Sequence, residues 1–127
     1  EFVEKCRRER KLFGGGMRQV GIIAAGALYA VRNNIGRLAE DHSNAKQLAT
    51  GLNETSAFAV DMSRVETNIV VAKIKDGSSS DAMAVRLKEF GVLAVPFGRD
   101  KIRFVAHLDV SADDCREALA RIKKHIN

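Results

Sequence analysis

Two hydrophobic periodicities divide the second half of the chain into short strands and helices. Four segments combine β-branched residues with alternating apolar positions, and we expect strands at residues 58–60, 68–74, 92–97 and 101–107. Apolar residues spaced three and four apart instead predict helices over residues 82–90 and 112–126. This order predicts that residues 55–127 form a small α+β domain with helices on one face of a sheet.

The first half of the chain is predicted to be helical. Residues 1–11 indicate a short charged helix, and a run of three glycines breaks it. Residues 17–32 indicate a helix that is apolar on nearly all sides, and an amphipathic helix follows from Ile35 to a stop at Gly51. Because a helix without a polar face needs cover all round, we expect residues 1–54 to pack on another domain or a neighbouring subunit.

Arg103 is the first candidate for a functional residue. In the strand at residues 101–107, Ile102, Phe104 and Ala106 share one face, and Arg103 lies on the other. A guanidinium among apolar neighbours needs a partner, and its fork matches a carboxylate. That carboxylate is either an internal Asp or Glu, or it belongs to a substrate; the pattern leaves both open.

The second candidate is the glycine run with its two flanking cations, Lys11 and Arg18. Glycines that open a helix expose backbone N–H groups, and a helix N-terminus favours anions. The segment therefore predicts either an anion site or a plain linker between two helices.

Composition narrows the class of protein. The chain has 127 residues and a formal charge of +5, from 21 Lys and Arg against 16 Asp and Glu. This length fits one domain or a piece of a larger protein. Cys6 and Cys115 are too few for a disulfide scaffold or a Cys-based zinc site. The free thiols, and a charged start unlike a signal peptide, predict a cytoplasmic location.

Several functions lack support in the sequence. The thirteen uncharged residues between Arg18 and Arg32 are too few for a membrane span, which needs about 20 apolar residues. The basic residues have no interleaved aromatic residues, so we favour a solvated helix face over a nucleic-acid surface. No nucleophile or phosphate-loop motif is complete, and the separated His42, His107 and His125 do not predict a metal site.

Four motifs resemble those of the low-specificity threonine aldolases, in the same order along the chain. They are KLFGGGMRQ at residues 11–19, RLAEDHSNA at 37–45, TNIV at 67–70 and RFVAHLDV at 103–110. The similarity extends over essentially the whole chain, and GGGMRQ is its most specific element. Ala106 is a departure, since a threonine is expected before the histidine.

This resemblance implies an α/β parent of the pyridoxal-phosphate-dependent transferase type, to which this chain contributes an interdomain helical segment and a small α+β C-terminal domain. Members of the family cleave threonine or allo-threonine to glycine and acetaldehyde. Their Schiff-base lysine precedes the part that this chain matches, so the resemblance implies no catalytic residue here and a cofactor held mainly by the missing part. It implies that Lys11 and Arg18 reach a neighbouring subunit's cofactor site, and that Arg103 binds the substrate carboxylate.

The resemblance also implies partners: an amino-terminal cofactor domain, an amino-acid substrate, and further copies in a homotetramer. It gives no reason to expect nucleic acid or a membrane. Without the lysine, we expect this chain alone to be inactive. The alternative, from the residues by themselves, is a stand-alone α+β module that binds an anion or a protein and has no catalytic activity.

Overall fold

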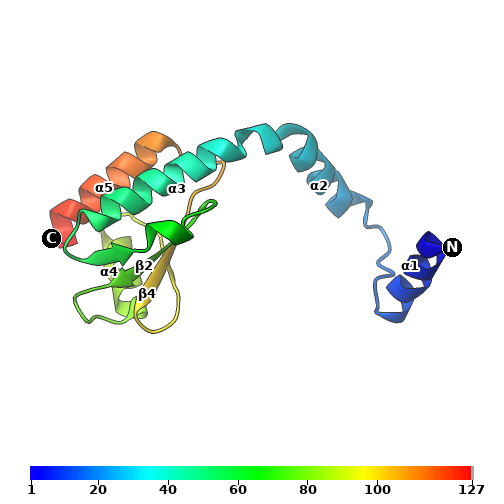
Figure 1. Cartoon of the computed structure of the whole chain (residues 1–127), viewed down its shortest axis with the longest axis horizontal. Coiled ribbons are helices and arrows are strands. Elements are labelled where there is room, and N and C mark those ends of the chain that lie inside the picture. The colour runs from blue at the N-terminus through cyan, green and yellow to red at the C-terminus, as the bar shows by residue number, and fades with distance from the viewer. Residues whose placement is uncertain (127) are drawn as a thin grey trace. The chain divides into compact units, whose positions relative to one another are not determined.

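The computed structural model describes residues 1–126, which fall into two compact units, one of Glu1–Gly36 and one that starts at Arg37. The first unit contains the helices α1 (Phe2–Leu12) and α2 (Gly21–Asn33). The second contains the remaining helices and strands (Figure 1): α3 (Leu38–Asn53), β1 (Phe58–Val60), β2 (Ile69–Ile74), α4 (Ser80–Glu89), β3 (Val95–Pro96), β4 (Lys101–Val105) and α5 (Ala112–Ile126). Single 3-10 turns lie at Ile35–Arg37 and Met62–Arg64.

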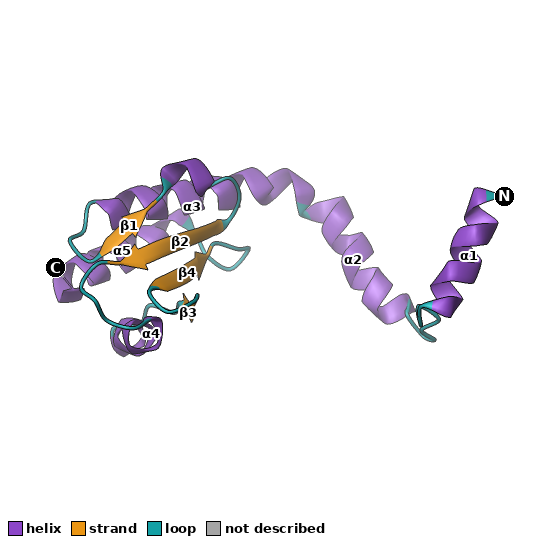
Figure 2. Cartoon of the chain, turned by 60° about the horizontal axis from the view of Figure 1, so that its bottom comes forward, coloured by secondary structure: helices purple, strands orange, loops and turns teal. Residues whose placement is uncertain are grey.

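The four strands form one antiparallel sheet in the order β1-β2-β4-β3 (Figure 2). The strands β2 and β4 are central, and Val71 lies opposite Arg103. All four predicted strands are present, although β3 is limited to two residues. Its Pro96 lacks an N–H group and lies on the sheet edge, where that group is not needed for strand pairing.

The core lies between one face of the sheet and the helices α3, α4 and α5. Ile102, Phe104 and Ala106 point into it, and each is 4% exposed or less. The ring of Phe58 meets that of Phe104 edge to face, with centroids 6.2 Å apart. The predicted inner face of the last strand is therefore confirmed, and the helices lie on one side of the sheet (Figure 2).

Polar residues cap the starts of the helices α4 and α5. The Ala82 N–H group donates to the Ser79 hydroxyl at 3.2 Å at the start of α4. At α5, the Asp114 N–H group donates to the Ser111 hydroxyl (3.1 Å) and the Ser111 N–H group donates to the Asp114 carboxylate (2.9 Å). This reciprocal pair is a capping box, which satisfies donors that the first helical turn leaves free.

The helix α3 belongs with the sheet. Its buried apolar side chains join the core beneath β1 and β2: Ala45, Leu48, Ala49 and Leu52. The second compact unit therefore begins at residue 37, whereas the sequence placed the boundary after residue 54. The start of α3 departs from the amphipathic pattern predicted from Ile35, because the apolar residues Leu38 and Ala39 are exposed and the polar residues Asp41 and Asn44 are buried. Those two polar residues are buried because each has a hydrogen-bond partner, described below.

Gly51 does not end α3, contrary to its predicted role. The helix continues to Asn53, and Gly51 is buried against α5. A Cβ atom at this position would lie 2.3 Å from Cδ1 of Leu119. The glycine therefore allows two helices to approach closely.

The glycine run caps α1 and does not open α2. Gly14 has a φ of +79°, and the N–H groups of Gly14 and Gly15 donate back to the carbonyls of Lys11 (3.2 Å) and Arg10 (2.7 Å). The helix α2 begins only at Gly21. The expectation that these glycines present N–H groups at the start of the apolar helix is therefore wrong.

The helix α2 has no buried residue, and its apolar side chains are open on several sides. Ile22 is 85% exposed and Tyr29 is 65% exposed. This leaves an exposed apolar surface on α2, and its burial against another domain or subunit stays a prediction. No helix within residues 1–126 combines the length and the apolar character that a bilayer span requires.

Candidate functional site

Arg103 lies at the centre of the sheet face opposite the helices. It is flanked by Val71 on β2 and Val95 on β3. Ile69 and Val105, on the same face, are 41% and 39% exposed. The cation is therefore set in an apolar surface, as the alternation of residues 101–107 predicted.

The Nε atom of Arg103 is buried and has no hydrogen-bond partner within residues 1–126. Its guanidinium also makes no ion pair with an Asp or Glu in that part of the chain. An unpaired buried donor costs about 1–3 kcal/mol, so this site favours an acceptor supplied from elsewhere. The internal carboxylate that the sequence left open is not found in this part of the chain.

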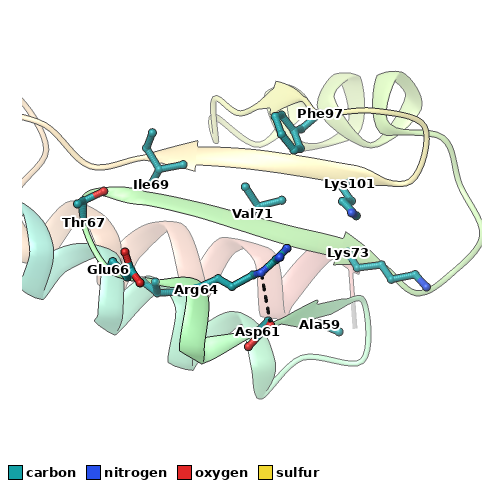
Figure 3. Close-up of a pocket in the computed structure, with 11 residues that line it drawn as sticks. Ala59, Asp61, Arg64, Glu66, Thr67, Ile69, Val71, Lys73, Phe97 and Lys101 are labelled. Carbon is teal, nitrogen blue, oxygen red and sulfur yellow. Dashed lines mark ion pairs between the residues drawn. The ribbon is translucent and has the colours of Figure 1, made fainter.

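A pocket of about 430 Å³ opens on the same face of the sheet, next to β1 (Figure 3). It combines apolar strand residues with charged residues at its rim: Ala59, Asp61, Arg64, Val65, Glu66, Thr67, Ile69, Val71, Lys73, Phe97 and Lys101. Asp61 pairs with Arg64 at 3.9 Å, and the hydroxyl and N–H groups of Ser63 donate to the Asp61 carboxylate and lower its pKa. Its lining comes from separate segments, and only Thr67 and Ile69 belong to one of the quoted motifs, TNIV, so the sequence did not identify the pocket.

Two of the family-like motifs meet at the end of β4. The Asn68 side chain, from TNIV, donates through Nδ2 to the carbonyl of Ala106 at 2.7 Å. In return, the Ala106 N–H group donates to the backbone carbonyl of Asn68 at 2.9 Å. Ala106 belongs to RFVAHLDV and lies three residues after Arg103. No role for Asn68 was evident from the sequence, because its partner lies 38 residues away.

A third motif, RLAEDHSNA, reaches the same segment from α3. The Asn44 side chain donates to the carbonyl of Val110 at 3.1 Å. One turn earlier, Arg37 donates two hydrogen bonds of 2.9 Å each to the two carboxylate oxygens of Asp41, which is 4% exposed. The structure therefore brings three of the four motifs together around the connection between β4 and α5.

Lys11 and Arg18 lie in the first unit and are both exposed. Lys11 is in the last turn of α1, and Arg18 is in the bend before α2. Within residues 1–126 neither side chain forms an ion pair or a hydrogen bond. Both cations are thus free to meet an anion from outside this part of the chain.

The histidines do not assemble into a site. His107 lies 3.8 Å from the Asp109 carboxylate, in an exposed turn, and His125 stacks on Phe90 with ring centroids 5.0 Å apart. His42 lies on α3. In the described residues, no group of three or more His, Cys, Asp and Glu side chains could hold a metal ion.

Comparison with known proteins places these features in a family. The family model described as "Beta-eliminating lyase" matches residues 1–76. The chain is 39% identical to "Low-specificity L-threonine aldolase 1" of Arabidopsis thaliana, over 94% of this chain and 34% of that protein. It is also 39% identical to "Low specificity L-threonine aldolase" of Escherichia coli (strain K12), over 98% of this chain and 34% of that protein. A similar protein of Candida albicans, "Low-specificity L-threonine aldolase", is 28% identical.

These similarities extend over nearly all of this chain, yet the chain spans only about a third of the length of the curated relatives it matches. The motifs that resembled threonine aldolases thus reflect a relationship along the whole chain, and that prediction is confirmed. The chain belongs to the beta-eliminating lyase family, among the low-specificity threonine aldolases.

Proposed function

We propose that this chain is the carboxyl-terminal part of a pyridoxal-phosphate-dependent aldolase that cleaves threonine or allo-threonine to glycine and acetaldehyde. The observation that carries the proposal is Arg103, whose buried Nε has no partner in the described residues and whose side chain lies on a sheet face without helices. The similarity to low-specificity threonine aldolases supports the reaction.

Arg103 is proposed to bind the carboxylate of the amino-acid substrate. The guanidinium fork offers parallel N–H groups that match two carboxylate oxygens, and the apolar neighbours Val71 and Val95 reduce competition from water. Fixing the carboxylate also fixes the direction of the Cα–Cβ bond, so this residue contributes to catalysis through orientation.

The residues of this chain fit a role at the edge of a pyridoxal phosphate site. Lys11 and Arg18 have no counter-ion in the described residues, as is suitable for cations that meet the phosphate group of a cofactor in a neighbouring subunit. When bound, pyridoxal phosphate supplies the electron sink that weakens the Cα–Cβ bond. None of the lysines here matches the Schiff-base lysine of the family, so the proposed catalytic centre lies in the part of the protein outside this chain.

Assembly is part of the same proposal. The open apolar surface of α2 and the unpaired cations of the first unit are suited to contact another domain or subunit. By the resemblance, the complete protein is a homotetramer located in the cytoplasm. Light scattering of the complete protein at micromolar concentration tests this, and a monomer would contradict it.

The activity is tested by measuring acetaldehyde released from L-threonine and L-allo-threonine. The complete protein that contains this chain should release it in the presence of pyridoxal phosphate, and the isolated chain with the same cofactor should not. An inactive complete protein with bound cofactor would reject the proposed reaction. Turnover by the isolated chain would show that the missing lysine is not required.

A further inference from the structure

We propose that Asn68 is a positioning residue for Arg103, an inference that rests on the proposed function. Asn68 immediately precedes β2, and it contacts the residue immediately after β4. Its side-chain Nδ2 atom donates to the Ala106 carbonyl at 2.7 Å, and its backbone carbonyl accepts from the Ala106 N–H group at 2.9 Å. One asparagine therefore satisfies both backbone polar groups of a residue that is 2% exposed.

This contact matters because, among the described residues, no side chain holds the Arg103 guanidinium. Its guanidinium makes no hydrogen bond or ion pair within residues 1–126, so its place depends on the backbone of β4. The pairing of β2 with β4 ends at Ile69 and Val105. Beyond that pair, Asn68 continues the ladder with its carbonyl and adds a side-chain bond, which resists fraying of the strand close to Arg103.

The opposite end of the same connection is also held by an asparagine. The Asn44 side chain on α3 donates to the Val110 carbonyl at 3.1 Å, and the Val110 N–H group donates to the His107 carbonyl at 2.8 Å. The segment from Ala106 to Val110 is thereby fixed at both ends. An amide suits the position of Asn68, since it donates to a buried carbonyl without bringing a charge to it.

The chain offers a matched control in Asn53. Its Nδ2 atom donates to the Val60 carbonyl at 2.9 Å, and its Oδ1 atom accepts from the Val60 N–H group at 2.7 Å. Both of these bonds come from the Asn53 side chain, whereas Asn68 contributes one side-chain bond and one backbone bond. Asn53 holds the edge strand β1, which β2 separates from β4. A general loss of stability should therefore appear in both sets of variants, and a loss of Arg103 positioning in only one.

The test uses the complete enzyme with Asn68→Asp, Asn68→Ser and the control Asn53→Ser. We expect both Asn68 variants to raise KM for threonine about fivefold, with kcat within about twofold, because ground-state binding of the carboxylate is weakened. Affinity for glycine, measured by titration calorimetry, should fall by a similar factor. Asn53→Ser should leave both binding parameters unchanged. If Asn68→Asp does not fold, Asn68→Ser still tests the proposal.

A double-mutant cycle separates this proposal from the proposed function. Adding Asn68→Ser to Arg103→Ala should produce no further rise in KM, since Asn68 acts through Arg103. Full additivity, or Asn68 variants that retain normal KM and glycine affinity while Arg103→Ala raises KM, would overturn the positioning role alone. A normal KM in Arg103→Ala itself would overturn the carboxylate-binding role and, with it, this inference.

Discussion

Gly51 on α3 and Leu119 on α5 lie so close that a Cβ atom at position 51 would overlap the Leu119 side chain. A Cβ atom there would be 2.3 Å from Cδ1 and 2.7 Å from Cδ2 of Leu119. Both residues are buried, and Leu119 is part of the core. The helices α3 and α5 cover the same face of the sheet, and their close approach therefore depends on a residue without a Cβ atom at position 51.

Gly51→Ala should lower the free energy of unfolding by about 1–3 kcal/mol, because overpacking forces the helices apart. Urea denaturation followed by circular dichroism measures this loss. In a Leu119→Ala background the added methyl group has room, so the same substitution should cost much less. An equal cost in both backgrounds would show that the contact with Leu119 is not its cause.

Removing Arg37 from its ion pair with the buried Asp41 should strongly destabilise the fold. Asp41 is 4% exposed and accepts two hydrogen bonds of 2.9 Å from Arg37. Arg37→Ala leaves that buried carboxylate without its cation, and we expect a loss of about 3 kcal/mol in the free energy of unfolding. Chemical denaturation at neutral pH measures it.

The control for that prediction is Arg64→Ala. Arg64 pairs with Asp61 at 3.9 Å, and both side chains are mostly exposed. Exposed pairs contribute about 0–1 kcal/mol, so this variant should be close to the parent in stability. Equal losses in the two variants would mean that burial of Asp41 does not decide the strength of its ion pair.

The sequence predicted the regular elements of the second unit better than it predicted the polar contacts between them. Alternation is a local signal, so it identified β4 and its buried residues Ile102 and Phe104. Burial of Asn44 could not be predicted in the same way, because its partner Val110 lies 66 residues further along the chain. Polar residues at the start of α3 are buried where they have a partner, which is distant for Asn44 but only four residues away for Asp41.

The structural roles of the glycines were also not predictable from the local sequence. Sequence position suggested a helix stop at Gly51 and a helix start after Gly16, and both expectations were wrong. Glycine serves equally in a turn, in a cap and at a close contact, and only the neighbouring elements decide among them. Arg103 was a clear candidate from sequence because a cation interrupts an apolar pattern, whereas Asn68 interrupts no pattern.

The capping box at the start of α5 should make stability depend on acidic pH. Hydrogen bonds from the hydroxyl and N–H groups of Ser111 lower the pKa of Asp114 below its usual value of 3.8. A carboxyl whose pKa is lower in the folded state stabilises the fold above its unfolded pKa, and this contribution is lost as pH falls through the folded pKa.

Ser111→Ala should raise the pKa of Asp114 toward 3.8, which carboxyl NMR titration measures. The variant should also lose less stability than the parent when pH falls from neutral to below that value. Asp114→Asn is the matched control, since it cannot titrate and should remove the whole of this pH dependence, including the part that the Ser111 N–H group supplies. An unchanged Asp114 pKa in Ser111→Ala would contradict the role of these hydrogen bonds.

The two cysteines should differ sharply in reactivity. Cys6 is exposed on α1, whereas Cys115 is 2% exposed on α5. Burial raises the pKa of the Cys115 thiol, so less of the reactive thiolate is present at neutral pH. A colourimetric thiol reagent should therefore modify one equivalent rapidly in the native chain. Cys6→Ser should abolish that rapid phase, and its persistence would assign the fast thiol to Cys115.

Arg103→Ala in the complete enzyme should lower kcat/KM for threonine about a hundredfold. A charge-assisted bidentate contact contributes on the order of 3 kcal/mol, and its loss should appear mainly as a higher KM. Arg103→Lys should recover only part of the loss, because an ammonium group cannot supply two parallel N–H donors. Steady-state kinetics of acetaldehyde release measures both variants, and the absorbance of bound cofactor should be retained.

Lys101→Ala provides the control for Arg103, since Lys101 lies on the same strand and the same face, two residues away. Removing this exposed cation lowers the charge of the sheet face by the same amount as Arg103→Ala does, but it leaves the Arg103 guanidinium in place. Its KM for threonine should therefore stay near that of the parent. If Lys101→Ala raises KM as much as Arg103→Ala does, the face attracts the substrate by its overall charge. In that case the guanidinium of Arg103 is not the carboxylate site.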